Sequence, residues 1–275
     1  MKQKKIISLS LSMVLAASML TGCGNKTASD AQQSAGTNAA ESTVVQDENT
    51  AADESTAAED ENTVADESTA AEDENKAAAE QLLADLTGTY QELWPVILDS
   101  QYEQLWLDNC AELVGEENAQ AAYDKLSSMV TGTIYGEEAV AAYADGGGVY
   151  DCSFTEGLNT LEFDGAASVI KGYDEAGIEL FSHTYHYVGM EETRGLYEYE
   201  SDDAESGEFT YFCMAPDTSA TTYHIEFRYG SDLDALGQYA EGNYAYWLAS
   251  GISTEYDQTM IENCIKLFCT ENLSE

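Results

Sequence analysis

The spacing of the apolar residues changes at about Val149, and this change restricts the fold more than any other feature of the sequence. Before it, apolar residues recur three and four positions apart, as in Tyr102, Leu105, Trp106 and Cys110, which is the spacing of amphipathic helices. After it come short runs in which apolar and polar residues alternate, separated by turns that contain Gly or Asp. These runs cover residues 149–154, 160–163, 178–188, 196–199, 209–214 and 222–229.

A final segment, residues 256–270, returns to helical spacing, so helices are expected on both sides of the strands. Strands that follow one another without helices between them favour an antiparallel sheet that is closed or nearly closed on itself. We therefore predict one α+β domain over residues 81–275, an antiparallel β-barrel with flanking N-terminal and C-terminal helices. A chain segment of this length can bury about 70% of its unfolded-state surface.

Residues 1–22 have the pattern of a secretory signal peptide. Lysines in the first five residues precede an apolar run from Ile6 to Leu20. At about 15 residues this run is short for a membrane-spanning helix, which needs roughly 20. The run ends in Leu20-Thr21-Gly22-Cys23, which resembles a bacterial lipobox and implies cleavage before Cys23 and lipidation of that residue. The expected location is extracytoplasmic, lipid-anchored to the cell membrane. An ordinary secretory signal with an incidental cysteine is the alternative.

Residues 23–80 are predicted to form a disordered, acidic, low-complexity tether. From Gly24 to about Glu80 the sequence contains no Trp, Tyr, Phe, Ile or Pro, so it lacks the apolar area that would offset the entropy of ordering. A polar repeat of 13 residues, Glu48–Asp60, recurs as Glu61–Asp73. A helix is the competing interpretation, because Ala and Glu favour helix, but the Thr, Ser, Asp and Asn of each repeat oppose it.

The charge of the chain excludes one class of partner. It has 52 acidic and 10 basic residues, for a formal net charge of −42. Binding to nucleic acid requires clustered cations against the phosphates, so no nucleic-acid partner is expected. An acidic surface attracts cations generally, and such attraction does not define a site.

Several segments between residues 86 and 247 share an order and spacing with a known family. They are Leu86–Pro95 (LTGTYQELWP), Tyr185–Gly189 (YHYVG), Arg194–Glu200 (RGLYEYE), Gly207–Phe212 (GEFTYF), Tyr223–Gly230 (YHIEFRYG) and Asn243–Trp247 (NYAYW). Together they resemble the ZinT family of secreted zinc-binding proteins. The resemblance implies a lipocalin-like barrel with added helices, zinc as the bound metal, and delivery of the metal to an ABC importer.

The zinc ligands of that family are represented here only in part. In the family, three histidines near the barrel mouth hold the metal, and two of them flank an aromatic residue. That triplet reads Thr222-Tyr223-His224 in this chain, and the segment before Ala215-Pro216 contains no histidine. The resemblance therefore assigns His224 alone.

The residues around His224 offer a partial replacement. Alternate residues of a strand face the same side, so His224 and Glu226 are expected together, and imidazole and carboxylate groups are ordinary zinc ligands. His183 and His186 are the only other histidines, and one of them is a predicted co-ligand. At most one can join His224, because their separation of three residues places them on opposite faces of a regular strand. Water would complete the site. The alternative for His224 is a hydrogen-bonded residue in the barrel wall.

The sequence thus predicts a lipid-anchored binding protein that captures zinc or a similar divalent metal ion, and the resemblance to the ZinT family implies an ABC importer as its partner. No catalytic motif such as a nucleophile elbow or a phosphate loop occurs, so no enzymatic activity is expected. The alternative is a ZinT-like domain without metal, which binds a small molecule or a partner protein at a barrel mouth rich in Tyr and containing Trp247. Five cysteines follow Cys23, and their pairing cannot be read from their spacing.

Overall fold

The computed structural model describes residues 61–146 and 149–274. The predicted signal peptide, Cys23 and the tether up to residue 60 lie outside these residues. From Thr69 onward the described residues belong to one compact unit.

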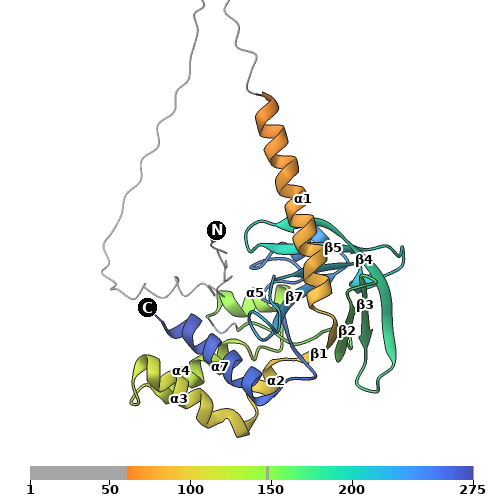
Figure 1. Cartoon of the computed structure of the whole chain (residues 1–275). Helices are drawn as coiled ribbons and strands as arrows, with labels where there is room; N and C mark the ends of the chain where they lie inside the picture. Colours follow the sequence, from red (N-terminus) through yellow and green to blue (C-terminus); the bar gives the residue numbers. More distant parts are fainter. Residues whose placement is uncertain (1–60, 147–148, 275) are drawn as a thin grey trace, which may run out of the picture. The chain divides into compact units, whose positions relative to one another are not determined.

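Eight antiparallel strands form a closed barrel, in which every strand pairs with its neighbours in the sequence and β1 pairs with β8 (Figure 1). The strands are β1 (Gly88–Glu92), β2 (Thr160–Asp164), β3 (Val169–Tyr173), β4 (Glu179–Glu191), β5 (Leu196–Ser201), β6 (Tyr211–Met214), β7 (Ile225–Gly230) and β8 (Ala249–Ser253). Closure leaves no sheet edge unpaired. The predicted lipocalin-like antiparallel barrel is confirmed.

The strands differ from the predicted runs in two ways. Strands β1, β3 and β8 fall where no alternating run was identified, because each has five residues and includes glycine or several polar residues. Backbone pairing with the strands on both sides stabilises them, rather than the intrinsic β-propensity of their residues. The predicted run 149–154 forms only an isolated bridge at Asp151, which pairs with Thr131 and Trp247.

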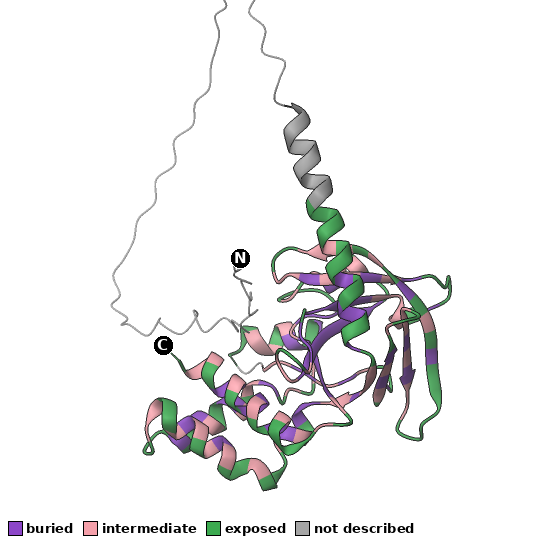
Figure 2. Cartoon of the chain, in the orientation of Figure 1, coloured by how far each residue is buried: buried purple, intermediate pink, exposed green. Residues whose placement is uncertain are grey.

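Aromatic side chains fill the interior of the barrel, and Figure 2 shows the buried residues concentrated along the strands. The rings of Phe181 and Phe209 lie 4.0 Å apart between centroids, and the Tyr229 and Trp247 rings meet edge to face at 4.9 Å. Such pairs stabilise a core beyond the area that they bury. The interior of the barrel is therefore a packed core and not an open ligand-binding cavity.

A second core lies between the barrel and a layer of helices. The helices are α2 (Trp94–Ile97), α3 (Glu103–Val114), α4 (Ala119–Met129) and α7 (Gln258–Leu273). Two further helices are α5 (Glu137–Ala144) and α6 (Leu233–Leu236), and α6 contacts β7 and contributes Leu236 to the barrel core. Ile252 of β8 packs in the second core with Ile261 and Ile265 of α7, and Figure 1 shows α3, α4 and α7 gathered at one side of the barrel. The predicted flanking helices at both ends of the domain are thus confirmed.

Helix α1 (Glu61–Asp85) crosses the predicted boundary between tether and domain at residue 80. Leu82 and Leu83 are buried in the barrel core, and the Tyr199 hydroxyl donates a hydrogen bond of 2.8 Å to the Ala79 carbonyl. The helix interpretation therefore holds for residues 61–80, and the domain begins before residue 81. Composition did not reveal this, because the stabilising contacts come from strands more than 100 positions away in the sequence.

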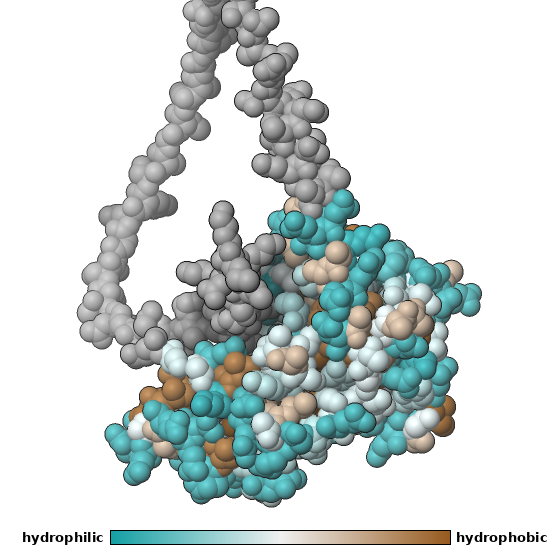
Figure 3. All heavy atoms as spheres, viewed as in Figure 1, coloured by the Kyte–Doolittle hydropathy of each residue, from teal (hydrophilic) through white to brown (hydrophobic). Residues whose placement is uncertain are grey.

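Hydrophilic residues cover most of the visible face of the domain, as the excess of acidic residues leads one to expect (Figure 3). No helix in the described segments is both long and apolar enough to cross a membrane. Cys110, Cys152, Cys213, Cys264 and Cys269 are buried free thiols, so the described residues contain no disulfide bond.

Candidate metal site

Asp217, His224 and Glu226 form a buried cluster of metal-ligating groups. One ligand atom from each side chain lies within 4.8 Å of the others. The residues are only 7%, 4% and 6% exposed, respectively. Buried ionisable groups are uncommon unless they are paired or bind a metal, so this cluster is the leading candidate for a functional site in the described residues.

The pairing of His224 with Glu226 follows from strand alternation. Ile225 and Phe227 point into the barrel core, so the residues between and before them point outward. On the outer side, the ring of His224 lies 5.0 Å from the ring of Phe268 on α7. The cluster therefore lies at the start of β7, between the barrel wall and α7, where solvent is excluded.

A tight turn brings Asp217 to the histidine. The backbone N–H groups of Thr222 and Tyr223 both donate to the Thr218 carbonyl, and Tyr223 has a positive φ of 69°. The predicted strand beginning at 222 is thus wrong in its first part: β7 begins at Ile225, and Thr222 does not share its face by alternation. The turn reverses the chain and places Asp217 beside His224.

The tautomer of His224 is fixed by the backbone. Its Nδ1 lies 2.7 Å from the Thr222 carbonyl oxygen, which only accepts, so Nδ1–H is the donor. The other ring nitrogen, Nε2, then faces the cluster, 3.5 Å from Glu226 Oε1. A backbone carbonyl that holds one nitrogen while the other faces a site is the common arrangement for a metal-ligating histidine.

The electrostatics of the cluster favour a cation. Burial raises the pKa of Asp217 to about 7, opposed by His224 and reinforced by Glu226. Burial acts to lower the pKa of His224, but Cys264 and Glu226 outweigh it and hold that pKa well above its ordinary value. Burial also raises the pKa of Glu271 on α7, and the charge of Glu226 adds to this shift. In the metal-free protein, the cluster therefore retains protons, because several carboxylates lie close together with only one imidazole to offset their negative charge.

The structure does not bring His183 or His186 to this cluster. Both lie on β4, which is separated from β7 by β5 and β6. As predicted, they face opposite sides: the His183 ring stacks near Phe181, while the His186 side chain is 53% exposed. Each Nδ1 lies 2.7 Å from a carboxylate oxygen, of Asp203 and Asp202 respectively. These are separate imidazole–carboxylate pairs at the surface.

Asp217 is the ligand candidate that sequence reasoning missed. It follows directly after Ala215-Pro216, the turn beside which the ZinT family carries a histidine. The predicted substitutes were histidines or residues on the same strand face as His224. The carboxylate next to that turn is the sequence feature that could have indicated Asp217 as a ligand.

The barrel mouth offers less to a ligand than the sequence suggested. Trp247 is 1% exposed, and its indole N–H donates to the Ser153 carbonyl at 2.9 Å. It is a core residue. The alternative of a small molecule bound at the mouth against Trp247 therefore has no support in the packing.

The comparisons with known proteins describe the fold. No protein-family model and no curated protein matches the sequence. Among solved structures, the chain is similar to the Zn(II)-bound ZinT-like domain of Streptococcus pneumoniae AdcA, with 14% identity and a TM-score of 0.43, over 66% of this chain and 89% of that domain. It is also similar to Zn(II)-bound AdcA from the same organism, with 14% identity and a TM-score of 0.40, over 70% of this chain and 35% of that one.

Proposed function

We propose that this protein is a lipid-anchored, extracytoplasmic metal-binding protein that holds zinc, or a similar divalent ion, through Asp217, His224 and Glu226. The observation that carries the proposal is the convergence of three buried ligand atoms within 4.8 Å of one another. Bonds from zinc to imidazole nitrogen and carboxylate oxygen are about 2.0–2.2 Å long, so ligand atoms on one ion are about 3–4 Å apart. A small contraction of the cluster would suffice.

Charge balance supports the same conclusion. In the described part of the chain, the one ion pair that Asp217 or Glu226 makes is the contact of Glu226 with His224. When ionised, the two buried carboxylates carry two negative charges, and the one imidazole can offset only one of them. A divalent cation would supply the missing positive charge and replace the protons that burial retains.

Helix α7 closes the site on the side away from the barrel. Cys264 is close enough to the His224 side chain to influence its pKa, and Glu271 lies near the two carboxylates of the cluster. These groups are spaced two helical turns apart on one face of α7. Water remains the expected further ligand.

The remaining parts of the proposal rest on the sequence. Attachment to the membrane depends on lipidation of Cys23, and delivery of the metal to an ABC importer depends on the resemblance to the ZinT family. We propose binding and transfer of the ion and no catalysis.

Zinc is expected to raise the melting temperature (Tm) of the metal-free wild type by about 5–10 °C at a concentration a hundred times its Kd. His224→Ala removes the central ligand and should abolish this rise. His186→Ala removes an exposed imidazole outside the cluster and should leave it intact, which makes it the matched control. Thermal melts with zinc and with chelator measure the effect. A wild type that shows no shift, and no retained zinc by elemental analysis, would refute the proposal.

Zinc binding is expected to weaken on acidification. The pKa of Asp217 in the folded protein is about 7, above its ordinary 3.8, so protonation stabilises the metal-free fold below about pH 4, and this stability is lost as the pH rises through 7. The ion requires the deprotonated carboxylate, so proton competition from this group alone weakens affinity by about tenfold per pH unit below 7. Competition titrations at pH 7.5 and 5.5 test this. Equal affinities would exclude Asp217 as a ligand.

A further inference from the structure

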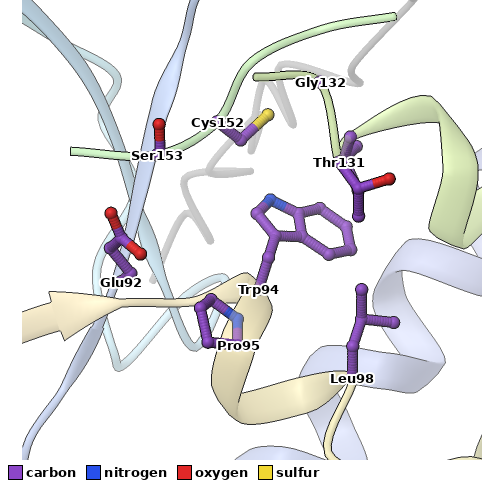
Figure 4. A pocket seen from close by; sticks show the side chains of 9 residues that line it. Glu92, Trp94, Pro95, Leu98, Thr131, Gly132, Cys152 and Ser153 are labelled. Carbon is purple, nitrogen blue, oxygen red and sulfur yellow. The ribbon is translucent and has the colours of Figure 1, made fainter. Parts of the chain in front are cut away.

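A pocket of about 290 Å³ is lined by residues of the segments around Trp94, Thr131 and Cys152 (Figure 4). It neighbours the metal cluster, because the charge of Glu226 adds to the effect of burial in raising the pKa of Cys152. Its apolar wall consists of Trp94, Pro95, Leu98 and Val130. None of the proposed metal ligands lines it. The volume is at the lower end for small-molecule sites, which are typically apolar with a few placed polar groups.

The indole of Trp94 carries an enclosed N–H donor in the wall of this pocket, on the side of Cys152. The residue is only 6% exposed, and its Nε1–H has no partner at hydrogen-bond distance and angle among the described residues. The nearby Cys152 thiol is a weak acceptor, and the indole N–H acts to lower its pKa against the larger effect of burial. Figure 4 shows the ring in the middle of the lining side chains, with its nitrogen on the side of Cys152. Part of the ring surface packs on Phe268, 4.8 Å away between centroids. A buried donor without a partner costs free energy, which a ligand that accepts a hydrogen bond would recover.

The opposite end of the pocket is acidic. One oxygen of Glu92 accepts a hydrogen bond of 2.7 Å from the Phe154 backbone N–H, which leaves the second oxygen without that partner. Burial raises the pKa of Glu92, the Phe154 N–H opposes this, and the charge of the buried Asp151 adds to it. Neither carboxylate forms an ion pair with Lys, Arg or His in the part of the chain that the structure describes. The pocket therefore lacks a positive charge.

We propose that this pocket binds a small organic cation that also carries a hydrogen-bond acceptor, of the amino-alcohol class. The ammonium group pairs with Glu92 and lies against the indole of Trp94, since aromatic faces attract cations. The hydroxyl oxygen accepts from Trp94 Nε1. Thr131 and Ser153 offer further hydroxyl groups at the rim. An anion is disfavoured by the carboxylates, and a purely apolar molecule leaves the indole donor without a partner.

The test compares choline with 3,3-dimethyl-1-butanol, its neutral isostere, on the full-length protein. Choline at about 10 mM is expected to raise the Tm of the wild type by about 2–4 °C and to change its tryptophan fluorescence. The neutral isostere should do neither. An equal response to both compounds would overturn the cationic class, and no response to choline would overturn the site.

Two variants and one control locate the effect. Glu92→Gln keeps an oxygen that can accept from the Phe154 N–H but removes the charge, so the choline shift should disappear. Trp94→Phe keeps a ring against Phe268 but removes the donor, so affinity should fall at least fivefold. Glu198→Gln makes the same change at another carboxylate whose pKa burial raises, outside the pocket, and should retain the wild-type response. Retention of the choline response in Glu92→Gln would overturn the assignment. The zinc response of that variant should be unchanged, which separates failure here from failure of the metal site.

Discussion

Replacing Asp217 with asparagine is expected to weaken zinc binding about 100-fold or more and, at the same time, to stabilise the metal-free protein by about 1–3 kcal/mol at pH 7.5. The two effects have opposite signs because the carboxylate that would bind the ion is a buried charge without it. Burial raises the pKa of Asp217 to about 7, so its ionised form is disfavoured in the fold. Asparagine has the same shape and removes that charge.

Zinc titration against a competing chelator and urea unfolding in EDTA measure the two effects separately. Asp202→Asn is the matched control, because Asp202 is an exposed carboxylate that also contacts an imidazole, that of His186. It should change neither quantity by more than about 0.5 kcal/mol. Unaltered zinc affinity in Asp217→Asn would remove this residue from the ligand set. A loss of metal-free stability would show that the ionised carboxylate has a structural role.

Replacing Arg228 with methionine is expected to lower the free energy of unfolding by about 3–4 kcal/mol. Arg228 is completely buried on β7, and its guanidinium donates to the backbone carbonyls of Leu236, Gln238 and Tyr244. It also lies over the ring of Tyr239, 4.3 Å from the centroid. Methionine fills similar space but leaves three carbonyls without this donor.

The opposing effect is the release of a buried charge, since burial lowers the pKa of Arg228. Replacement of a buried ion by an apolar residue can be neutral or stabilising when its partners leave with it. Here the partners are backbone groups and remain, so we expect the loss to dominate. Arg228→Lys keeps the positive charge but lacks the planar guanidinium group, so its free energy of unfolding should lie between those of the wild type and the methionine variant. Urea unfolding measures all three proteins, and a methionine variant as stable as the wild type would contradict this account.

The fold class was predictable because it depends on patterns that the sequence carries locally. The alternating runs around Tyr199 and Phe227 predicted strands, and the spacing of Ile261, Cys264 and Phe268 predicted the last helix. Closure of the barrel follows from a series of such strands. The short strands β1 and β8 were missed because their residues take their conformation from the neighbouring ladders.

The candidate site was predictable in one pair of residues. His224 and Glu226 lie two positions apart at the start of a strand, so alternation alone placed them together. The predicted co-ligands His183 and His186 lie on a strand that is not adjacent to theirs in the barrel. Asp217 reaches the pair through a turn whose geometry depends on a positive φ at Tyr223. A tyrosine rarely adopts a positive φ, so the sequence did not indicate this turn.

By itself, the sequence determined the alternation of residues along β7 and therefore which side chains share a face, because a period of two is a property of any extended chain. It also determined that histidine was too scarce to rebuild a three-histidine site. The tertiary structure decided which face of β7 met helix α7 and which acid joined His224. It also left the Trp94 indole donor unpaired at the edge of a pocket. These features depend on contacts between segments distant in the chain, and local pattern does not encode the packing that brings such segments together.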